Sequence, residues 1–343
     1  MPHPRLSGRD AVLIGRWLLL AVLLLVGCAP SHTYRYRQLV MGVETTVSIV
    51  SDDETRAVEG GRLAFARLAE LEQVMSDYRP DSELLRLCAT YDVAVPVSAD
   101  LFEVLARADE IRRESGGAFD ISVGPLTLLW REARNRGAFP SDAAIAEART
   151  RCGGDAIVLD PHERTVTLRR AQMRLDLGGI GKGFGAAKAI ETLADAGFPQ
   201  ALVAIAGDIA AGEAPPGRSG WSVDIERPDG TRESIDLAHA SVSTSGDREQ
   251  FIERDGVRYS HLLDPRSGIG STTQRQVTVI GPDGATVDAL SSALCIADEE
   301  TVRRLLVRYG DRYRAIMAPS APPSPVATPS GADRSAPPPA AGR

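Results

Sequence analysis

A glycine-rich stretch, Asp176-Leu-Gly-Gly-Ile-Gly-Lys-Gly183, has a composition that suits the binding of a phosphate group. We expect it to follow a strand and to open a helix, so that free backbone N–H groups and the positive end of the helix dipole face one ligand. Lys182 adds a full positive charge. The spacing matches neither a Walker motif nor a dinucleotide-binding fingerprint. A flexible turn that only packs helix on strand is the alternative, and this stretch alone does not decide between the two.

A carboxylate and two hydroxyls are spaced to share one helix face in Asp288-Ala-Leu-Ser-Ser292. Residues i and i+4 of a helix are neighbours, so Asp288 and Ser292 would point the same way, with Ser291 beside them. Hard oxygen ligands of this kind suit Mg²⁺, which usually keeps several waters and shares substrate phosphates. The alternative is that Asp288 only interacts with the dipole at the N-terminus of the helix.

Two further segments carry polar groups. Tyr259-Ser-His-Leu-Leu-Asp-Pro-Arg-Ser-Gly268 places His261 three residues before Asp264, where the imidazole could act as a general base. A polar turn after a strand is the alternative. Ser243-Thr-Ser-Gly-Asp247 is rich in hydroxyls, predicts a loop, and means little by itself.

Taken in order, these segments resemble a known family, the FAD:protein FMN transferases of ApbE type. The resemblance covers about Met41 to Ala297, nearly the whole body of the chain. It includes four more segments that fall in the family's order: Met41-Gly42, Tyr78-Arg-Pro-Asp-Ser-Glu-Leu84, Gly116-Gly-Ala-Phe-Asp-Ile-Ser-Val-Gly-Pro125 and Gly207-Asp208. Each segment alone is weak, whereas the ordered set is specific.

The resemblance implies roles that spacing alone does not give. Met41 and Tyr78 would border the flavin. FAD would be contacted by Ala118, Phe119, Asp120, Asp176, Lys182 and Leu262. Mg²⁺ would be held by the backbone carbonyl of Gly179, by Asp288 and on the hydroxyl side by Ser291 and Ser292. His261 matches the family's catalytically important histidine.

Four positions depart from the family's pattern. Val43 stands where Thr is frequent, Gly181 where Ala is common, and Ser291 where Ala is frequent. Ser292 replaces a Thr but keeps the oxygen. A backbone-carbonyl ligand is insensitive to side-chain change, so the resemblance still implies a metal site, of an affinity that the sequence leaves open.

The activity implied by the resemblance is metal-dependent transfer of FMN from FAD to a Ser or Thr hydroxyl of a target redox protein, with release of AMP. The metal would be Mg²⁺, with Mn²⁺ left open, and His261 would accept the proton. Two alternatives remain: an FAD pyrophosphatase with water as acceptor, and a lipid-anchored flavin-binding protein that does not cleave FAD. The intact pair Asp288 and Ser292 argues against the second.

The overall composition is that of a soluble globular protein. The chain has 343 residues, of which 43% are hydrophobic and 25% charged. A net charge of -7 and an aromatic content of 5% give no sign of a nucleic-acid-binding surface. The four cysteines, Cys28, Cys88, Cys152 and Cys295, include no CxxC pair and predict neither a zinc site nor a disulfide framework. If Cys28 carries lipid, at most one disulfide can form among the other three.

The first residues predict a targeting segment. Three arginines precede an unbroken apolar run at 17–26, which is about half the length needed to span a bilayer but suits a signal-peptide core. The run ends in Leu25-Val-Gly-Cys28, which resembles a bacterial lipobox. We therefore predict a signal peptide at 1–27. A plain signal peptide with a chance cysteine, or an uncleaved anchor helix, is the alternative.

Cleavage at the lipobox would leave Cys28 as a diacylated N-terminus. Two or more acyl chains anchor a protein stably where one does not. The expected location is therefore a membrane surface that faces the periplasm or the cell exterior. Ala29, in place of Asp, favours the outer membrane if the cell has one.

Hydrophobic periodicity predicts the elements of the body. A strand at 39–50 is followed by a helix that Ser51 opens, with Glu54 in a capping box and an apolar stripe at Ala57, Gly61, Ala64, Leu68, Leu71 and Met75. Further helices are expected at 99–115, 141–153, 183–196, 286–297 and 299–309. Strands are expected at 156–159, 165–168, 173–177, 201–206, 221–226, 233–242, 276–280 and 313–317, with a hairpin at Asp255-Gly256.

This order of elements predicts the fold class. Helices come first and mixed strands and helices follow, which indicates an α+β or irregular mixed α/β fold in a single catalytic body at 28–318. The remainder, 319–343, consists of Pro, Ala, Ser and Gly with almost no large apolar residue. Such a composition predicts a disordered tail.

Overall fold

The computed structural model describes residues 31–227, 229–246 and 251–317. The predicted signal peptide, the lipidation site at Cys28 and the predicted tail at 319–343 lie outside these residues. Within the described part of the chain, none of the helices combines the length and the apolar character that a membrane span requires.

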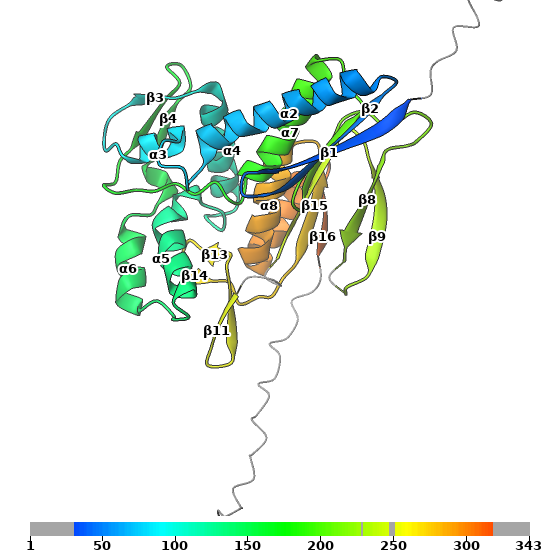
Figure 1. Ribbon diagram of the computed structural model, residues 1–343. Coiled ribbons are helices and arrows are strands. Elements are labelled where there is room, and N and C mark those ends of the chain that lie inside the picture. Colours follow the sequence, from blue (N-terminus) through cyan, green and yellow to red (C-terminus); the bar gives the residue numbers. More distant parts are fainter. Residues whose placement is uncertain (1–30, 228, 247–250, 318–343) are drawn as a thin grey trace, which may run out of the picture.

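A seven-stranded antiparallel sheet forms the centre of the molecule (Figure 1). Its strands, in spatial order, are β1 (His32–Val40), β2 (Val43–Ser51), β6 (Ala201–Ile205), β7 (Asp208–Ala211), β10 (Ala240–Ser245), β15 (Val277–Gly281) and β16 (Arg314–Met317). Side chains alternate between the two faces of each strand. Thr45, Val47 and Ile49 of β2 therefore all point to one face, where each is fully buried.

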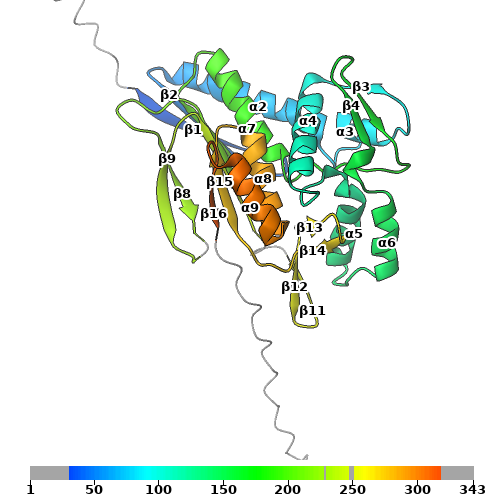
Figure 2. The same cartoon turned by 180° about the vertical axis from the view of Figure 1, so that it is seen from behind.

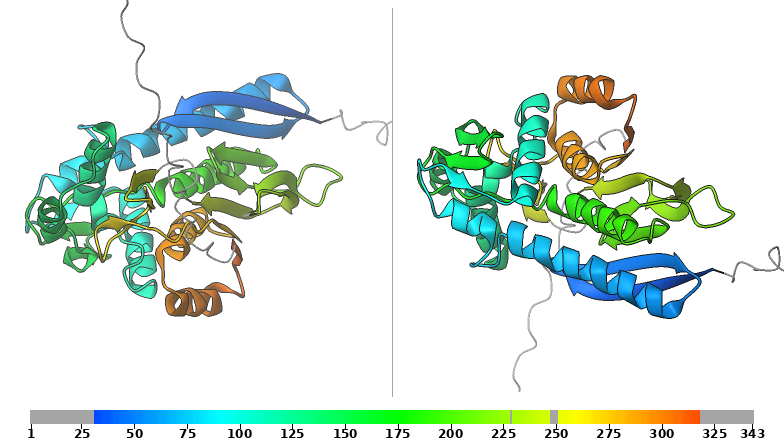
Figure 3. Two further views of the ribbon diagram at one scale, coloured as in Figure 1. Left: turned by 90° about the horizontal axis from the view of Figure 1, so that it is seen from below. Right: turned by 90° about the horizontal axis from the view of Figure 1, so that it is seen from above.

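Three helices cover that face in the same order as the strands beneath them (Figure 3). They are α2 (Glu54–Met75) on β1 and β2, α7 (Gly181–Asp195) on β6 and β7, and α8 (Gly284–Ile296) on β10 and β15. Helix α9 (Glu299–Tyr309) follows α8 and is seen from behind in Figure 2.

Helices α7 and α8 touch backbone to backbone. A Cβ atom at Gly183 would lie 2.1 Å from the carbonyl oxygen of Gly284, and one at Gly284 would lie 2.2 Å from that of Gly183. Only glycine allows this approach at either position. The contact brings the side chain of Asp288, one turn further along α8, against the first turn of α7.

The opposite face of the sheet is covered by a hairpin, β8 (Trp221–Glu226) and β9 (Arg232–Leu237). Strand β8 alternates buried and exposed residues, with Trp221, Val223 and Ile225 directed to the sheet. This is the period-two pattern of a strand with one solvated face.

A mostly helical region lies beside the sheet. It contains α3 (Glu83–Cys88), α4 (Ala99–Glu114), the 3-10 helices η1 (Ile121–Val123) and η2 (Gly154–Ala156), α5 (Gly124–Asn135), α6 (Asp142–Thr150) and the small sheet of β3 (Val95–Pro96), β5 (Thr165–Leu168) and β4 (Ile157–Asp160). Two hairpins, β11 (Phe251–Arg254) with β12 (Val257–Ser260) and β13 (Leu263–Asp264) with β14 (Ile269–Gly270), complete it.

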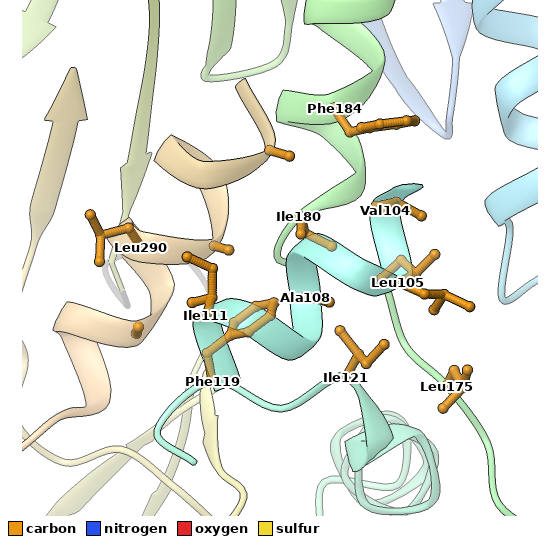
Figure 4. Packing of buried hydrophobic residues seen from close by; sticks show 14 of the residues in the cluster. Val104, Leu105, Ala108, Ile111, Phe119, Ile121, Leu175, Ile180, Phe184 and Leu290 are labelled. Atoms are coloured by element: carbon orange, nitrogen blue, oxygen red, sulfur yellow. The ribbon is translucent and has the colours of Figure 1, made fainter. Parts of the chain in front are cut away.

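One hydrophobic core joins this region to the sheet helices. In Figure 4, Leu105 and Ile111 of α4 lie among Ile180 and Phe184 around the start of α7 and Leu290 of α8. Each buried side chain of this size contributes roughly 1.5–3 kcal/mol. The core therefore fixes the N-terminal end of α7 against both regions.

The mixed α/β fold class is confirmed. The helices expected at 99–115, 141–153 and 299–309 are present, and the whole apolar stripe predicted for the first helix is buried in α2. The hairpin at Asp255-Gly256 is also present, and both residues have positive φ.

Three predicted elements have other bounds in the structure. The strand predicted at 39–50 is a hairpin, because Met41 and Gly42 take positive φ and turn β1 into β2. Ser51 ends β2, and the helix is capped instead by Asp53, whose carboxylate accepts hydrogen bonds from the backbone of Thr55 and Arg56. The strand predicted at 233–242 is divided at His239, where φ is also positive.

The segment 173–177 is extended but is not a strand. Its backbone bonds to parts of the chain that are not strands: the N–H of Asp176 donates to the carbonyl of Ile121, and the N–H of Leu175 to the sulfur of Cys88. Cys88 has no disulfide partner, and Cys152 and Cys295 are free thiols as well. The one disulfide that the sequence allowed is therefore not formed.

Candidate active site

The glycine-rich stretch forms the loop that precedes α7 and the first turn of that helix. The carboxylate of Asp176 accepts a hydrogen bond of 2.8 Å from the N–H of Gly178, which shapes the turn. Helix α7 begins at Gly181, and no side chain caps its N-terminus. The prediction that the stretch opens a helix is confirmed.

Three charged side chains meet at this end of α7. Nζ of Lys182 lies 2.7 Å from a carboxylate oxygen of Asp208, on β7, and 3.7 Å from one of Asp288, on α8. Asp288 also accepts a hydrogen bond of 3.0 Å from the N–H of Gly183. Both carboxylates are almost fully buried, Asp208 with 4% and Asp288 with 2% exposure.

The two buried carboxylates are incompletely neutralised by one lysine. Burial and the charge of Asp208 raise the pKa of Asp288 to about 7, although Lys182 and the Gly183 N–H lower it. Burial acts to lower the pKa of Lys182, but Asp288 and Asp208 together outweigh that effect and raise it. The site is therefore short of positive charge and would favour a bound cation.

A cluster of serine hydroxyls lies beside Asp288. Ser243 and Ser245 project from β10 toward Ser291 and Ser292 of α8. Ser291 is fully buried and bonds to the backbone carbonyl of Asp288, whereas Ser292 keeps 5% exposure. A Cβ atom at Gly179 would lie 3.2 Å from the Ser292 hydroxyl, so the glycine-rich loop passes directly over this serine.

A second group of residues lies on the loop after α2. The guanidinium of Arg131, on α5, lies 4.4 Å from the ring centroid of Tyr78, a cation–π distance. Arg131 also pairs with Asp77 at 2.6 Å and with Asp176 at 3.6 Å. The ring of Tyr78 is 74% exposed, so one face remains open to a ligand.

One cavity of about 820 Å³ joins the two groups. Of the predicted site residues it is lined by Tyr78, Ala118, Phe119, Asp120, Asp176, Gly179, Lys182, His261, Leu262, Asp288 and Ser292. Its volume is at the upper end of the range for small-molecule sites. Predicted site residues from five separate sequence segments therefore line the same cavity.

Two predicted residues lie outside the cavity lining, and the carboxylate of a third also has a structural role. Met41 does not line the cavity; its side chain packs instead against α7, where a Cβ atom at Gly185 would lie 3.0 Å from it. Ser291 does not line it either. Asp120 does, but its carboxylate already accepts hydrogen bonds from the N–H groups of Ser122 and Gly154 and so fixes η1.

The sequence did not single out three residues that the structure brings to the site. Asp208 belongs to the segment Gly207-Asp208, which indicates no role by itself, yet its carboxylate is the nearest one to Lys182. Arg131 lies in a helix that shows no local motif. Ser245 stood in a hydroxyl-rich segment expected to be a loop, and it is the last residue of β10.

Comparison with known proteins identifies the fold and the family. The profile of the ApbE family matches residues 41–317. The chain belongs to the ApbE family. It is 35% identical over 305 residues to the FAD:protein FMN transferase of Treponema pallidum, with 82% of this chain and 84% of that protein covered. The enzyme of that name from Haemophilus influenzae is 32% identical, with 81% and 82% covered.

A solved structure supports the same assignment. The crystal structure of the apo form of the flavinyl transferase ApbE from Pseudomonas stutzeri superimposes with a TM-score of 0.73 at 31% sequence identity. The match covers 83% of this chain and 90% of that one. The cavity described above therefore belongs to an ApbE fold.

The donor set at Asp288 fits a hard divalent cation. Among the described residues there is no cluster of three or more His, Cys, Asp or Glu side chains that could hold a metal. Mg²⁺ does not require such a cluster, because it needs only one or two carboxylates together with water and substrate phosphate. Asp288, Ser292 and the loop at Gly179 supply oxygen atoms of that kind.

Proposed function

We propose that this protein transfers FMN from FAD to a Ser or Thr hydroxyl of a target protein and releases AMP, with the help of Mg²⁺. The observation that carries the proposal is the convergence of Lys182, Asp208 and Asp288 at the N-terminus of α7, within one cavity that also reaches Tyr78. A pyrophosphate needs positive charge, which the N-terminal end of the α7 dipole, Lys182 and a bound Mg²⁺ would supply together.

The two groups of residues would bind different parts of FAD. The open face of Tyr78, held by Arg131, offers a stacking surface for a flat ring system. The first turn of α7 receives the pyrophosphate, with Lys182 as the cationic side chain. Phe119 and Leu262 also line the cavity and give it apolar surface.

The metal would be held by Asp288, Ser292 and the backbone at Gly179. When bound, Mg²⁺ neutralises the charge that grows on the leaving phosphate. Lys182 lies between the two carboxylates and would present its positive charge to the pyrophosphate oxygens. The bond that breaks joins the FMN phosphorus to the bridging oxygen, which leaves as part of AMP, and the bond that forms joins the FMN phosphorus to the acceptor oxygen.

His261 is the residue that we assign to the proton of the acceptor hydroxyl. It follows β12, is exposed, and lines the same cavity. An imidazole can accept a proton near neutral pH. Its place at the open side of the cavity lets a side chain of another protein reach it.

The test is incubation of the purified protein with FAD, Mg²⁺ and a flavin-carrying redox protein. We expect AMP in solution and a covalent FMN adduct on one Ser or Thr, detected by mass spectrometry of the intact protein. Free FMN without an adduct would indicate a pyrophosphatase that uses water. Unchanged FAD would contradict both activities.

We also propose that the protein is exported and anchored by lipid at Cys28. The support is the sequence Leu25-Val-Gly-Cys28 directly after an apolar run. Cys28→Ala should release the protein from the membrane fraction or leave it unprocessed. Retention in membranes at the mature size would contradict lipidation.

A further inference from the structure

Four serine hydroxyls beside Asp288 form a connected chain of hydrogen bonds. Ser291 donates to the backbone carbonyl of Asp288 over 2.9 Å. Ser245 lies 2.7 Å from Ser291 and 3.1 Å from Ser292, and so links the two helix residues. Ser243 lies 3.3 Å from Ser291 and has no bond to Ser292 among those of the described residues.

The direction of every bond in this chain follows from counting protons. A hydroxyl has one proton to donate and two lone pairs. A carbonyl oxygen can only accept, so Ser291 donates its hydroxyl proton to the backbone carbonyl of Asp288. Ser245 must then donate to Ser291, because Ser291 has only lone pairs left.

The same count fixes the proton of Ser292. Since Ser245 has given its proton to Ser291, the contact between Ser245 and Ser292 requires Ser292 to donate. Ser292 lines the cavity and Ser291 does not. The Ser292 oxygen therefore turns lone pairs, and no proton, toward the cavity.

We propose that Ser245 is a positioning residue that prepares Ser292 to bind a divalent cation. This inference rests on the proposed function, since it concerns the metal of that same site. A cation is attracted by lone pairs and repelled by a hydroxyl proton, so an oxygen whose proton is already committed is a better ligand. Such orienting partners of metal ligands typically change metal affinity by 10- to 100-fold.

The residue type at position 292 gives this role a physical reason. A Thr side chain has few rotamers because two heavy atoms branch at Cβ. Ser lacks that restriction, and its hydroxyl needs another constraint. In this chain the bond from Ser292 to Ser245 supplies it.

The experiment measures metal binding by the full-length protein without FAD, so that turnover plays no part. Mn²⁺ is the probe, and the free ion is counted by electron paramagnetic resonance during a titration. The variants are Ser245→Val and Ser245→Thr, which have the same shape and differ only in the hydroxyl. Ser243→Ala is the matched control, because Ser243 is on the same strand and, among the described residues, its hydroxyl bonds to Ser291 and not to Ser292.

We expect the Mn²⁺ dissociation constant of Ser245→Val to rise about tenfold or more. Ser245→Thr and Ser243→Ala should stay within about twofold of the wild type. The double variant Ser245→Val/Ser291→Ala should bind no more weakly than Ser245→Val, because Ser291 acts only through Ser245. Melting temperatures of all variants check that the fold is kept.

The outcomes separate this inference from the proposed function. Equal Mn²⁺ affinity for Ser245→Val and Ser245→Thr overturns the role of Ser245 and leaves the metal site intact. Failure of the wild type to bind Mn²⁺ overturns this inference, whereas failure to transfer FMN from FAD overturns the proposed function. If Ser245→Val does not fold, equal affinity of Ser245→Ala and the wild type overturns the role in the same way.

Discussion

The two ends of the cavity hold their charges in different ways. At the inner end, Asp208 and Asp288 project from β7 and α8 and are almost fully buried around Lys182. At the outer end, Tyr78 lies on a loop with a mostly exposed ring, and Arg131 holds it from α5. The inner end is set by regular elements in contact through backbone, and the outer end by side chains on a surface loop.

This difference indicates which part of the reaction each end controls. Buried charges on rigid elements are pre-organised for charge that develops in the transition state. An exposed ring on a loop gives contacts that are the same before and during the reaction. Changes at the inner end should therefore affect turnover, and changes at the outer end should affect FAD binding.

The largest effect is expected from Asp288→Ala. Loss of this carboxylate removes the main charged ligand of the proposed metal, so turnover should fall by at least about 10²–10³-fold. Flavin fluorescence should show that FAD binding is largely retained. Ser292→Ala should be milder, because water can replace a neutral hydroxyl. Normal FMN transfer by Asp288→Ala at saturating Mg²⁺ would falsify the assignment of the inner end.

The raised pKa of Asp288 predicts a pH dependence of the inner end. Without metal, its contribution to stability is present below its ordinary pKa of about 4 and is lost as the pH rises through the raised pKa of about 7. A cation needs the ionised carboxylate, so Mg²⁺ affinity should fall about tenfold per pH unit below 7 and level off above it. Mg²⁺ titrations between pH 5.5 and 8.5 measure this, and an affinity that does not change with pH contradicts it.

At the outer end, Tyr78→Ala should weaken FAD binding by about tenfold, because a stacked ring is worth roughly 1–3 kcal/mol. The rate at saturating FAD should change by less than about threefold. Tyr91→Ala is the matched control, since Tyr91 is also exposed and does not line the cavity. If the transfer rate at saturating FAD fell by the same factor as the FAD affinity, the two ends of the cavity would not differ in function.

The smallest effect is expected from removal of the C-terminal residues after Pro319. Their composition lacks the apolar content that packing requires. The shortened protein should keep FMN transfer within about twofold in solution. A large loss of activity would show that this segment contributes to one end of the cavity.

The local elements could be predicted because short-range rules decide them. The buried stripe of α2 follows from spacings of three and four residues, and the hairpin at Asp255-Gly256 from residues that tolerate positive φ. The exceptions have local competitors. Ser51 and Asp53 are both residue types that cap helices. Ser51 pairs with His32 in the sheet, so Asp53 caps the helix.

The amino-acid sequence by itself determined the ApbE resemblance, the apolar patterns and the residue types that can bind phosphate and metal. Only the tertiary structure decided which of those residues meet. Lys182 reaches Asp208 and Asp288 because Gly183 and Gly284 let two helices touch, and Ser245 reaches Ser292 across 47 positions of the sequence. No local rule links such distant positions, since their contact depends on how whole helices and strands pack against one another.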